Sequence, residues 1–394
     1  MTPDWTALAP HRPLESGSAR YVAPPWSAGA EIADRVIAGA RTILVGGPAG
    51  IGKSTELASA AALLRGKGSR VACLVPIDVW ENMRRLTPDQ LLLRIAGTVA
   101  LVGVQGLSLP LNNDLLGALA GAGVLDPEFV GEAYFSYTAS ARTLAHAVLD
   151  EVARLSPQGR VTLLIDGMEK VPEGAASIEL FDALGDLPDH VEQVVVVPWH
   201  ATYGPHSETV IRPGEHWMIL RPDPAEGVDG EPTRAFLRDV VARRLSLDAA
   251  LLAPGPSAAR VAAEAGGYDV PPAGFPALVA KAAVWSAGIP RIFLQLLADA
   301  GTNARLRGAD HWPSEEDFAD AVSDLEDSFR RALLPGDTEA SLAAEGTDGR
   351  ELDLDRKIRL LARGLLLERR DGKRIVLAIH PLARRTFEEG RVHA

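Results

Sequence analysis

The segment from Thr42 to Thr55 constrains the fold of this chain more than any other. Within it, residues 47–54 match the pattern G-x-x-x-x-G-K-[ST] at every position. The β-branched run before the glycines predicts a buried strand, and the Ala- and Leu-rich run after them predicts a helix that begins near Lys53. Because strand, turn and helix in this order are the context that the pattern needs, we expect an α/β fold built on a parallel sheet.

The chemistry of this loop predicts binding of a nucleoside triphosphate. The glycines let successive backbone N–H groups point into one concavity, and the start of the helix adds partial positive charge. Lys53 is expected to reach the β- and γ-phosphates, and the Ser54 hydroxyl to complete a Mg²⁺ shell. A glycine-rich turn can also join a strand to a helix without a ligand, but the Lys-Ser pair at this spacing favours ATP or ADP with Mg²⁺. The expected nucleotide-binding residues of the loop are Gly47, Pro48, Ala49, Gly50, Ile51, Gly52, Lys53, Ser54 and Thr55.

A second apolar run, residues 161–165, ends in Asp166. At the carboxyl edge of a parallel sheet this carboxylate is expected to hold Mg²⁺ together with Ser54; the alternative is an aspartate that only begins a turn. The next acid is Glu169, which orients the attacking water if the chain curls back and is otherwise an exposed surface charge. The expected catalytic residues are therefore Lys53, Asp166 and Glu169.

The rest of the chain divides by pattern into four regions. Residues 1–30 read as an extended arm, 31–225 as a nucleotide-binding core with a helical insertion at 87–156, 226–308 as a helical lid, and 309–394 as a winged-helix domain. Strands are expected at 42–46, 70–77, 161–165, 193–198 and 217–220, with a hairpin at 365–370 and 374–379 turned by Asp371-Gly372. The main helices are expected at 30–38, 87–102, 113–122, 138–155, 232–246, 257–265, 275–287, 290–300, 314–331, 354–363 and from Pro381.

Composition and charge limit the cellular compartment and the classes of partner that we expect for this chain. The single cysteine, Cys73, excludes a disulfide within the chain, and the N-terminus lacks the pattern of a secretory signal, so we expect a cytoplasmic protein without a membrane partner. The net charge of −12 argues against a chain that coats nucleic acid with its whole surface. Residues 350–394, however, carry 12 Lys and Arg against seven Asp and Glu, which marks the C-terminal end as a separate unit.

The run from Ile165 to Glu169, together with the phosphate loop, resembles the STAND class of signal-transduction ATPases, including its NACHT branch. That class belongs to the AAA+ and origin-recognition-like ATPases. The resemblance follows the order of elements over roughly residues 20–390, and short motifs carry it. Many related ATPases place Glu directly after the metal-binding Asp, where this chain has Gly167.

The resemblance implies nucleotide sensors outside the core. Pro290 and Arg291 are similar to a lid motif whose arginine senses phosphates; otherwise they are a first-turn proline and a surface residue. His380 is similar to the winged-helix histidine that contacts bound diphosphate, although those members usually carry Asp where Pro381 stands; alternatively it caps the hairpin or is buried. His200 follows strand 193–198 and is the candidate for the polar sensor of the core.

Two functions are therefore expected. The first is an ATP-binding switch with slow hydrolysis, which controls a separate effector protein and self-associates on ATP binding. The alternative is an AAA+ ATPase that loads or remodels DNA through its basic winged helix. The basic residues of the winged-helix region alternate with acids. The simpler interpretation is therefore that they form a solvated face without a nucleic-acid partner. A small-molecule kinase is disfavoured, because the lid and winged-helix regions have no place in a compact kinase.

Overall fold

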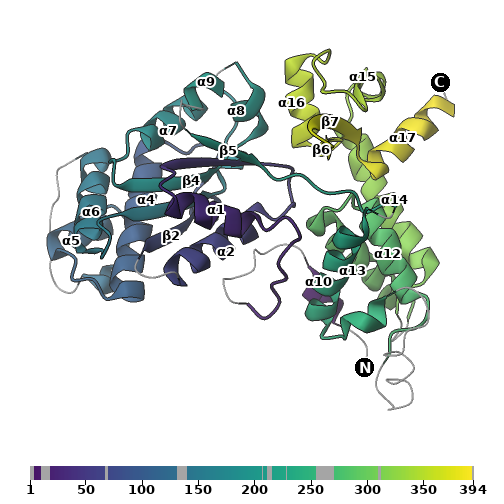
Figure 1. Ribbon diagram of the computed structural model, residues 1–394, viewed down its shortest axis with the longest axis horizontal. Helices are drawn as coiled ribbons and strands as arrows, with labels where there is room; N and C mark the ends of the chain where they lie inside the picture. Colours follow the sequence, from purple (N-terminus) through teal and green to yellow (C-terminus); the bar gives the residue numbers. More distant parts are fainter. Residues whose placement is uncertain are drawn as a thin grey trace. The chain divides into compact units, whose positions relative to one another are not determined.

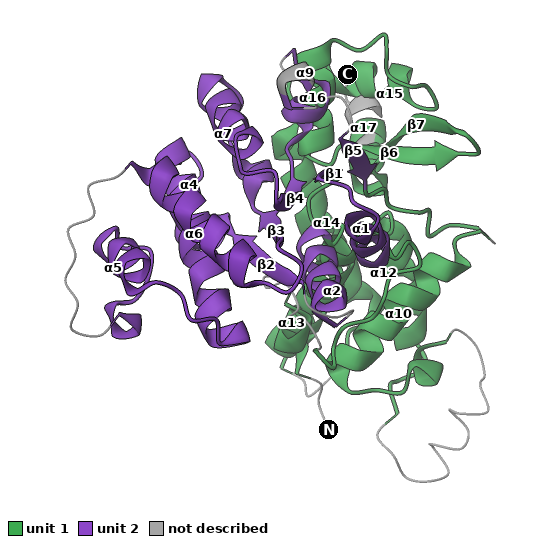
Figure 2. Cartoon of the chain, turned by 60° about the vertical axis from the view of Figure 1, so that its left-hand side comes forward, with its two compact units in different colours: residues 1–27, 47–52, 220–394 green, residues 28–46, 53–219 purple. Residues whose placement is uncertain are grey.

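The computed structural model describes residues 4–9, 18–66, 70–130, 140–205, 207–210, 215–227, 229–253, 270–308 and 312–392. The chain forms two compact units, which are coloured in Figure 2. One consists of residues 28–46 and 53–219 and is called the sheet unit here. The other consists of residues 1–27, 47–52 and 220–394 and is called the helical unit.

The sheet unit is built on five parallel strands in the order β2-β3-β4-β1-β5. The strands are β1 (Thr42–Gly46), β2 (Val71–Pro76), β3 (Val161–Asp166), β4 (Val191–Val196) and β5 (His216–Ile219). β1 to β4 are apolar and almost wholly buried, as expected for parallel strands covered on both faces. All five predicted strands are confirmed to within two residues at each end.

Helices cover both faces of this sheet. In Figure 2, α4, α6 and α7 lie on one side of the strands, and α1 and α2 lie on the other. This division follows from right-handed crossovers, because the chain moves from β1 to the far edge at β2 and then returns strand by strand. The bounds are α1 (Ala28–Ile37), α2 (Lys53–Gly66), α3 (Ile77–Trp80), α4 (Pro88–Leu101), η2 (Val102–Gly106), α5 (Asn113–Gly121), η3 (Pro127–Phe129), α6 (Ala141–Leu155), η4 (Met168–Lys170), α7 (Ala175–Gly185), α8 (Trp199–Tyr203) and α9 (Ser207–Val210).

The predicted helices between 87 and 156 are present, but two of them belong to the core of the unit. A capping box between Thr87 and Gln90 starts α4, and Ser140 caps α6. α4 and α6 pack on each other and against β2 and β3, and their leucines and valines join the main hydrophobic cluster. These helices therefore cover the sheet, because a strand buried on both faces needs apolar helices on each side.

The helical unit contains the elements that were expected as lid and winged helix. Its bounds are η1 (Trp5–Leu8), α10 (Glu231–Leu245), η5 (Ala249–Leu252), α12 (Phe275–Trp285), α13 (Pro290–Leu306), α14 (Glu315–Ala332), α15 (Asp337–Ala344), α16 (Leu354–Ala362), β6 (Leu366–Asp371), β7 (Arg374–Ile379) and α17 (Pro381–Val392). One core contains Phe275 of α12, Phe293 of α13, Phe318 of α14 and Leu382 of α17. The predicted helix at 257–265 lies outside the described residues. The predicted boundary at residue 308, between the helical lid and the winged-helix domain, remains a proposal.

The N-terminal arm differs from the expectation. Residues Trp5–Leu8 form a 3₁₀ turn that is capped by the Asp4 side chain, and Trp5 is 2% exposed. Its ring lies edge-on to Phe275 and Trp312, at centroid distances of 5.7 and 5.6 Å. It also abuts Gly301, where an added Cβ would lie 2.3 Å from the ring. An indole buries a large apolar area, which is why this segment joins the core rather than extending into solvent.

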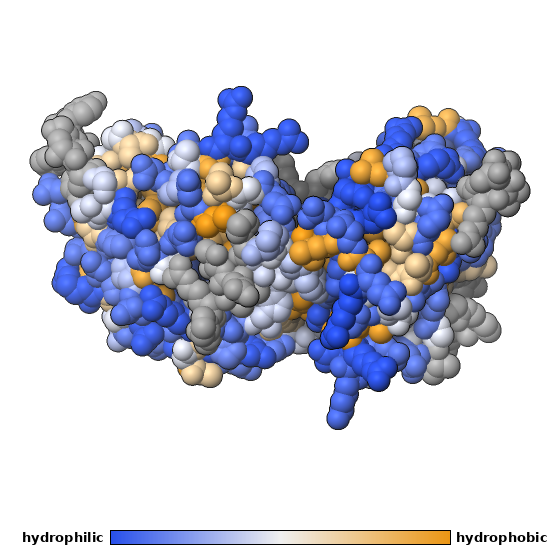
Figure 3. Space-filling model, turned by 90° about the horizontal axis from the view of Figure 1, so that it is seen from above, coloured by the Kyte–Doolittle hydropathy of each residue, from blue (hydrophilic) through white to orange (hydrophobic). Residues whose placement is uncertain are grey.

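The C-terminal part combines helices with an antiparallel hairpin, as a winged helix does (Figure 1). The predicted hairpin is present, but its turn consists of Gly372 and Lys373, one residue later than predicted, because Asp371 still pairs with Arg374 at the end of β6. Gly372 has a φ of +57°, which a glycine adopts readily in such a turn. The α/β phosphate-loop fold with helical and winged-helix regions is thus confirmed. On the face drawn in Figure 3, hydrophobic residues form small areas among hydrophilic ones. Within the described ranges, no helix combines the length and apolar character that crossing a bilayer requires.

Candidate nucleotide site

The phosphate loop joins the end of β1, at Gly46, to the start of α2, at Lys53. Gly47 has a φ of +139° and Gly50 has a φ of +85°, both in the region that favours glycine. A Cβ at Gly47 would lie 2.6 Å from the carbonyl oxygen of Leu220, and one at Gly50 would lie 2.5 Å from Cβ of Arg291. These glycines are therefore required by both backbone conformation and space.

Arg291 lies directly against this loop, and both belong to the helical unit. Its backbone N–H donates to the carbonyl oxygen of Gly50 at 3.3 Å. Pro290 is the first residue of α13, where its missing N–H costs no hydrogen bond, and it fixes the direction in which the helix starts. The structure thus brings the predicted lid residues to the loop, while the Arg291 side chain remains exposed.

Lys53, Ser54 and Asp166 come together within the sheet unit. Lys53 and Asp166 are each 6% exposed, and Ser54 donates a side-chain hydrogen bond to Asp166. Burial raises the pKa of Asp166, the hydrogen bond from Ser54 opposes that shift, and the charge of Asp78 adds to it. Among the described residues, Oδ1 of Asp166 has no hydrogen-bond partner. This buried carboxylate oxygen needs a partner that the described residues do not supply.

Glu169 lies in η4, the turn that follows β3, and the charge of Lys53 acts on its carboxylate. Burial raises the pKa of Glu169, and the nearby charge of Lys53 is the largest effect that opposes this. Its Oε2 atom is buried and has no hydrogen-bond partner in the described part of the chain. The chain therefore turns directly after Asp166, at Gly167 and η4, and the next acid along the sequence is within electrostatic range of the Lys53 ammonium.

The donor set fits Mg²⁺. Mg²⁺ is usually held by one or two carboxylates together with phosphate oxygens and water, so a hydroxyl and one open carboxylate oxygen suffice. Ser54 and Asp166 supply these two groups. The described residues contain no group of three His, Cys, Asp or Glu side chains that could hold a metal without a nucleotide. The geometry thus suits a metal ion that arrives with a polyphosphate.

Asp78 and Lys170 also lie at this edge of the sheet, and the sequence prediction missed them. Asp78 belongs to α3, which continues directly from β2, and it forms an ion pair with Lys170. A signal was present, because an apolar run that ends in an acid describes residues 71–78 as well as 161–166. The pattern was applied only to the second of these runs.

The other two predicted sensors, His200 and His380, are each packed among residues of their own unit. His200 is on α8, and its Nε2 lies 3.2 Å from Oγ of Ser177 on α7; burial lowers the pKa of its imidazole. His380 is fully buried in the helical unit, where Nδ1 accepts the backbone N–H of Leu382 at 3.2 Å and the ring packs on Phe329. Contact between His380 and a nucleotide would therefore require a rearrangement of that unit.

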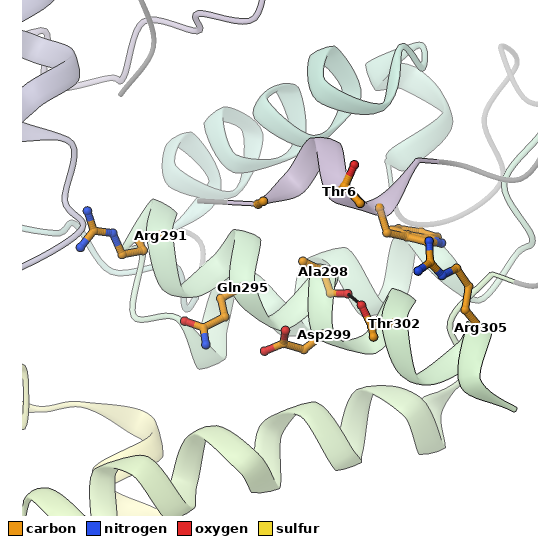
Figure 4. Close-up of a pocket in the computed structure, with 9 residues that line it drawn as sticks. Thr6, Arg291, Gln295, Ala298, Asp299, Thr302 and Arg305 are labelled. Carbon is orange, nitrogen blue, oxygen red and sulfur yellow. Dashed lines mark hydrogen bonds between the residues drawn. The ribbon is translucent and has the colours of Figure 1, made fainter. Parts of the chain in front are cut away.

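A cavity of about 490 Å³ follows the exposed side of α13 (Figure 4). Arg291 lies toward one end of α13 and Arg305 toward the other, with Gln295 and Asp299 between them along the helix. The cavity is open and has both polar and apolar lining, and it begins at the residue that contacts the phosphate loop.

The fold is similar to that of a Walker-type ATPase from Pyrococcus abyssi, with a TM-score of 0.56 and 12% sequence identity over 97% of this chain and 99% of that one. The Orc1 protein of Aeropyrum pernix in complex with DNA aligns with a TM-score of 0.46, 14% identity and coverage of 98% and 96%. Cdc6p of Pyrobaculum aerophilum aligns with a TM-score of 0.44, 13% identity and 98% coverage of both chains. Only the first score is high enough to support the fold, and at this identity it supports nothing further. No family model matches the chain, and no curated protein matches its sequence.

Proposed function

We propose that this chain binds ATP with Mg²⁺ and hydrolyses it to ADP and phosphate. The observation that carries the proposal is the buried Asp166 together with the half-buried Glu169: each has a buried oxygen atom without a hydrogen-bond partner among the described residues, and the charge of Lys53, at the start of α2, acts on both. Perturbed and unpaired ionisable groups of this kind concentrate at functional sites. Stability alone gives no reason to bury them.

Each residue then has a separate role. The loop N–H groups and Lys53 bind the phosphates, and Lys53 stabilises the charge that develops on the oxygen between the β- and γ-phosphorus atoms. Ser54 and Asp166 would hold Mg²⁺, which would neutralise phosphate charge when bound. Glu169 orients a water molecule toward the γ-phosphorus and accepts its proton as the new P–O bond forms and the bond to ADP breaks.

The hydrolysis assay that tests this compares the protein with its Asp166→Asn variant at saturating Mg²⁺ and ATP. We expect the variant to lose about 100-fold or more of its turnover, because an amide is a poor replacement for a charged metal ligand. Asp189→Asn is the matched control, since Asp189 is a surface carboxylate of the same unit with a 94% exposed side chain. Equal turnover in Asp166→Asn and the parent protein would refute the assignment.

We further propose that the nucleotide acts as a switch of the STAND kind, with slow hydrolysis, that controls a separate effector and self-associates with ATP. The contact between Arg291 and Gly50 supports this, because it ties the start of α13 to the loop that receives the phosphates. A γ-phosphate that binds Arg291 would strengthen the contact between the start of α13 and the loop. His380 is proposed to join this contact only after rearrangement.

Small-angle scattering and sedimentation with ADP and with a non-hydrolysable ATP analogue test the switch. We expect different profiles in the two nucleotides, and the same profile in both for Arg291→Ala. Identical profiles of the parent protein in the two nucleotides would remove the switch while leaving ATP hydrolysis standing.

The alternative, action on DNA, rests on the tip of the hairpin. Arg370, Lys373 and Arg374 are exposed there, and none of them forms an ion pair with a described residue. By contrast, Arg359 and Arg356 pair with Asp337, and Arg384 pairs with Glu345. Part of the positive charge at the C-terminal end is thus compensated locally, which weakens but does not remove this alternative.

A salt titration of duplex binding separates the two proposals. DNA bound through the hairpin tip should lose affinity with a log–log slope of about −0.9 for each phosphate neutralised. Combining Lys373→Glu with Arg374→Glu should reduce that slope by about 2, whereas Arg350→Glu, at a locally paired surface residue, should not. Absence of measurable binding at low salt would eliminate the DNA proposal.

A further inference from the structure

The turn that carries Glu169 is shaped by a residue from another strand. After Asp166 the chain enters the left-handed region at Gly167, with a φ of +92°, and then forms the 3₁₀ turn η4. Lys170 and Val171 close this turn by donating their backbone N–H groups to Gly167 and Met168, both at 3.1 Å. So short a turn has few bonds of its own to hold it.

The space beside Gly167 is filled by Asp78. In the β2–β3 register Pro76 pairs with Asp166, so α3 leaves the sheet next to η4. A Cβ at Gly167 would lie 2.6 Å from Oδ1 and 2.7 Å from Cβ of Asp78. Asp78 therefore prevents any side chain directly after Asp166. This gives a physical reason why the first acid beyond the metal-binding residue stands at position 169.

Asp78 also holds the far end of the turn. Its Oδ2 pairs with Nζ of Lys170, the last residue of η4. With three residues per turn, consecutive side chains of a 3₁₀ helix point about 120° apart. Fixing Lys170 toward Asp78 therefore turns Glu169 to another side, where its Oε2 atom is buried and the charge of Lys53 acts on it.

From this arrangement we propose that Asp78 is a positioning residue for ATP hydrolysis: it occupies the space beside Gly167, anchors Lys170, and thereby fixes the carboxylate of Glu169 in its working direction. The inference rests on the proposed hydrolytic function. Asp78 itself contacts neither nucleotide nor water in this account. Its effect belongs to the chemical step and leaves ground-state binding of ATP unchanged.

The kinetic test uses both members of the ion pair. Asp78→Asn and Lys170→Gln should each lower kcat by about 10- to 100-fold with ATP affinity changed by less than about twofold. The double variant should be no slower than the slower single variant, because the two residues act as one unit. Lys170→Arg, which keeps the pair, should restore most of kcat. Since the Lys170 side chain is 56% exposed, its replacement should not unfold the protein.

Glu81→Gln is the matched control, because Glu81 directly follows α3 and forms an ion pair with Arg94 without touching η4. Its kcat should stay within about twofold of the parent value. A kcat of Asp78→Asn equally close to the parent value would overturn the proposal, as would losses that multiply in the double variant.

Hydrogen exchange separates this inference from the hydrolytic function itself. In Asp78→Asn the amides of Lys170 and Val171 should exchange about 10-fold faster than in the parent protein, and those of Glu81→Gln should not. If the parent protein shows no hydrolysis that depends on Asp166, the proposed function fails. Faster exchange in Asp78→Asn would still support the role of Asp78 in holding the turn η4. Unchanged exchange in Asp78→Asn would overturn the positioning role of Asp78, whatever the hydrolytic activity of the variant.

Discussion

Asp166 and Asp337 are both buried carboxylates, one in each unit, and their surroundings are opposite. Asp337 is fully buried, and its two oxygen atoms accept hydrogen bonds from Arg359 at 2.6 and 2.7 Å. The backbone N–H of Leu334 adds a third bond at 2.8 Å, and the hydrogen bonds from Arg359 are the main reason that the pKa of Asp337 is lowered. Asp166 has the Ser54 hydroxyl, an unpaired Oδ1 and a raised pKa.

This difference separates a structural carboxylate from a functional one. Buried polar groups are normally hydrogen-bonded, because an unsatisfied group costs free energy. Asp337 follows that rule and ties α15 to α16. Asp166 and Glu169 each have a buried oxygen atom that lacks a hydrogen-bond partner among the described residues, and the charge of Lys53 acts on both. This is expected where the missing partner is a ligand.

The largest effect is expected at Asp337. Asp337→Asn leaves Arg359 without its carboxylate, and losing one partner of a buried pair costs about 3 kcal/mol of unfolding free energy. Denaturant unfolding should show that loss, whereas Asp166→Asn should unfold at the same denaturant concentration as the parent protein or a higher one. If Asp166→Asn were the less stable variant, the contrast between the two carboxylates would be wrong.

Glu169→Gln should lower kcat by about 100-fold, since it removes the group that accepts the proton of water. The affinity for ATP should be preserved, because the amide keeps the shape of the side chain. Single-turnover hydrolysis and equilibrium binding of the same preparation measure the two quantities. Turnover at the parent rate would make Glu169 a buried acid without a role in hydrolysis.

His380 offers a smaller, pH-dependent test of a buried group in the helical unit. Burial, assisted by the charge of Arg369, lowers the pKa of its imidazole to about 3. The unfolded chain, with a pKa near 6.5, therefore binds a proton that the folded chain excludes, and the unfolding free energy falls as the pH drops from 6.5 toward 3. Between pH 7 and 5 the parent protein should lose about 2 kcal/mol more than His380→Asn, whose amide oxygen can still accept the Leu382 N–H. Parallel losses in the two proteins would show that His380 is not buried as a neutral group.

The sequence predicted the local parts of the site and missed the parts that depend on packing. The loop, Asp166 and the strand ends could be predicted because glycine spacing and apolar runs are local signals. The apolar run that ends in Asp78 places an acid after a strand, but the position of Asp78 beside Gly167 could not be predicted, since it depends on the register between β2 and β3. The buried position of His380 likewise depends on Phe329, a residue of another helix. The N-terminal turn was predicted as extended because its partners, Phe275 and Trp312, lie far along the chain.

Calorimetric titration of ATP with Mg²⁺ into the parent protein and into Lys53→Ala tests the central claim most directly. Lys53 is buried beside two open carboxylates, and we propose that its ammonium group faces the phosphates. Its loss should weaken binding by at least about 10-fold, equivalent to a charge-assisted hydrogen bond of roughly 1.5–3 kcal/mol. Saturable binding by the parent protein with this loss in Lys53→Ala is the predicted result. Equal affinity of the two proteins, or no binding by the parent protein, would contradict the account.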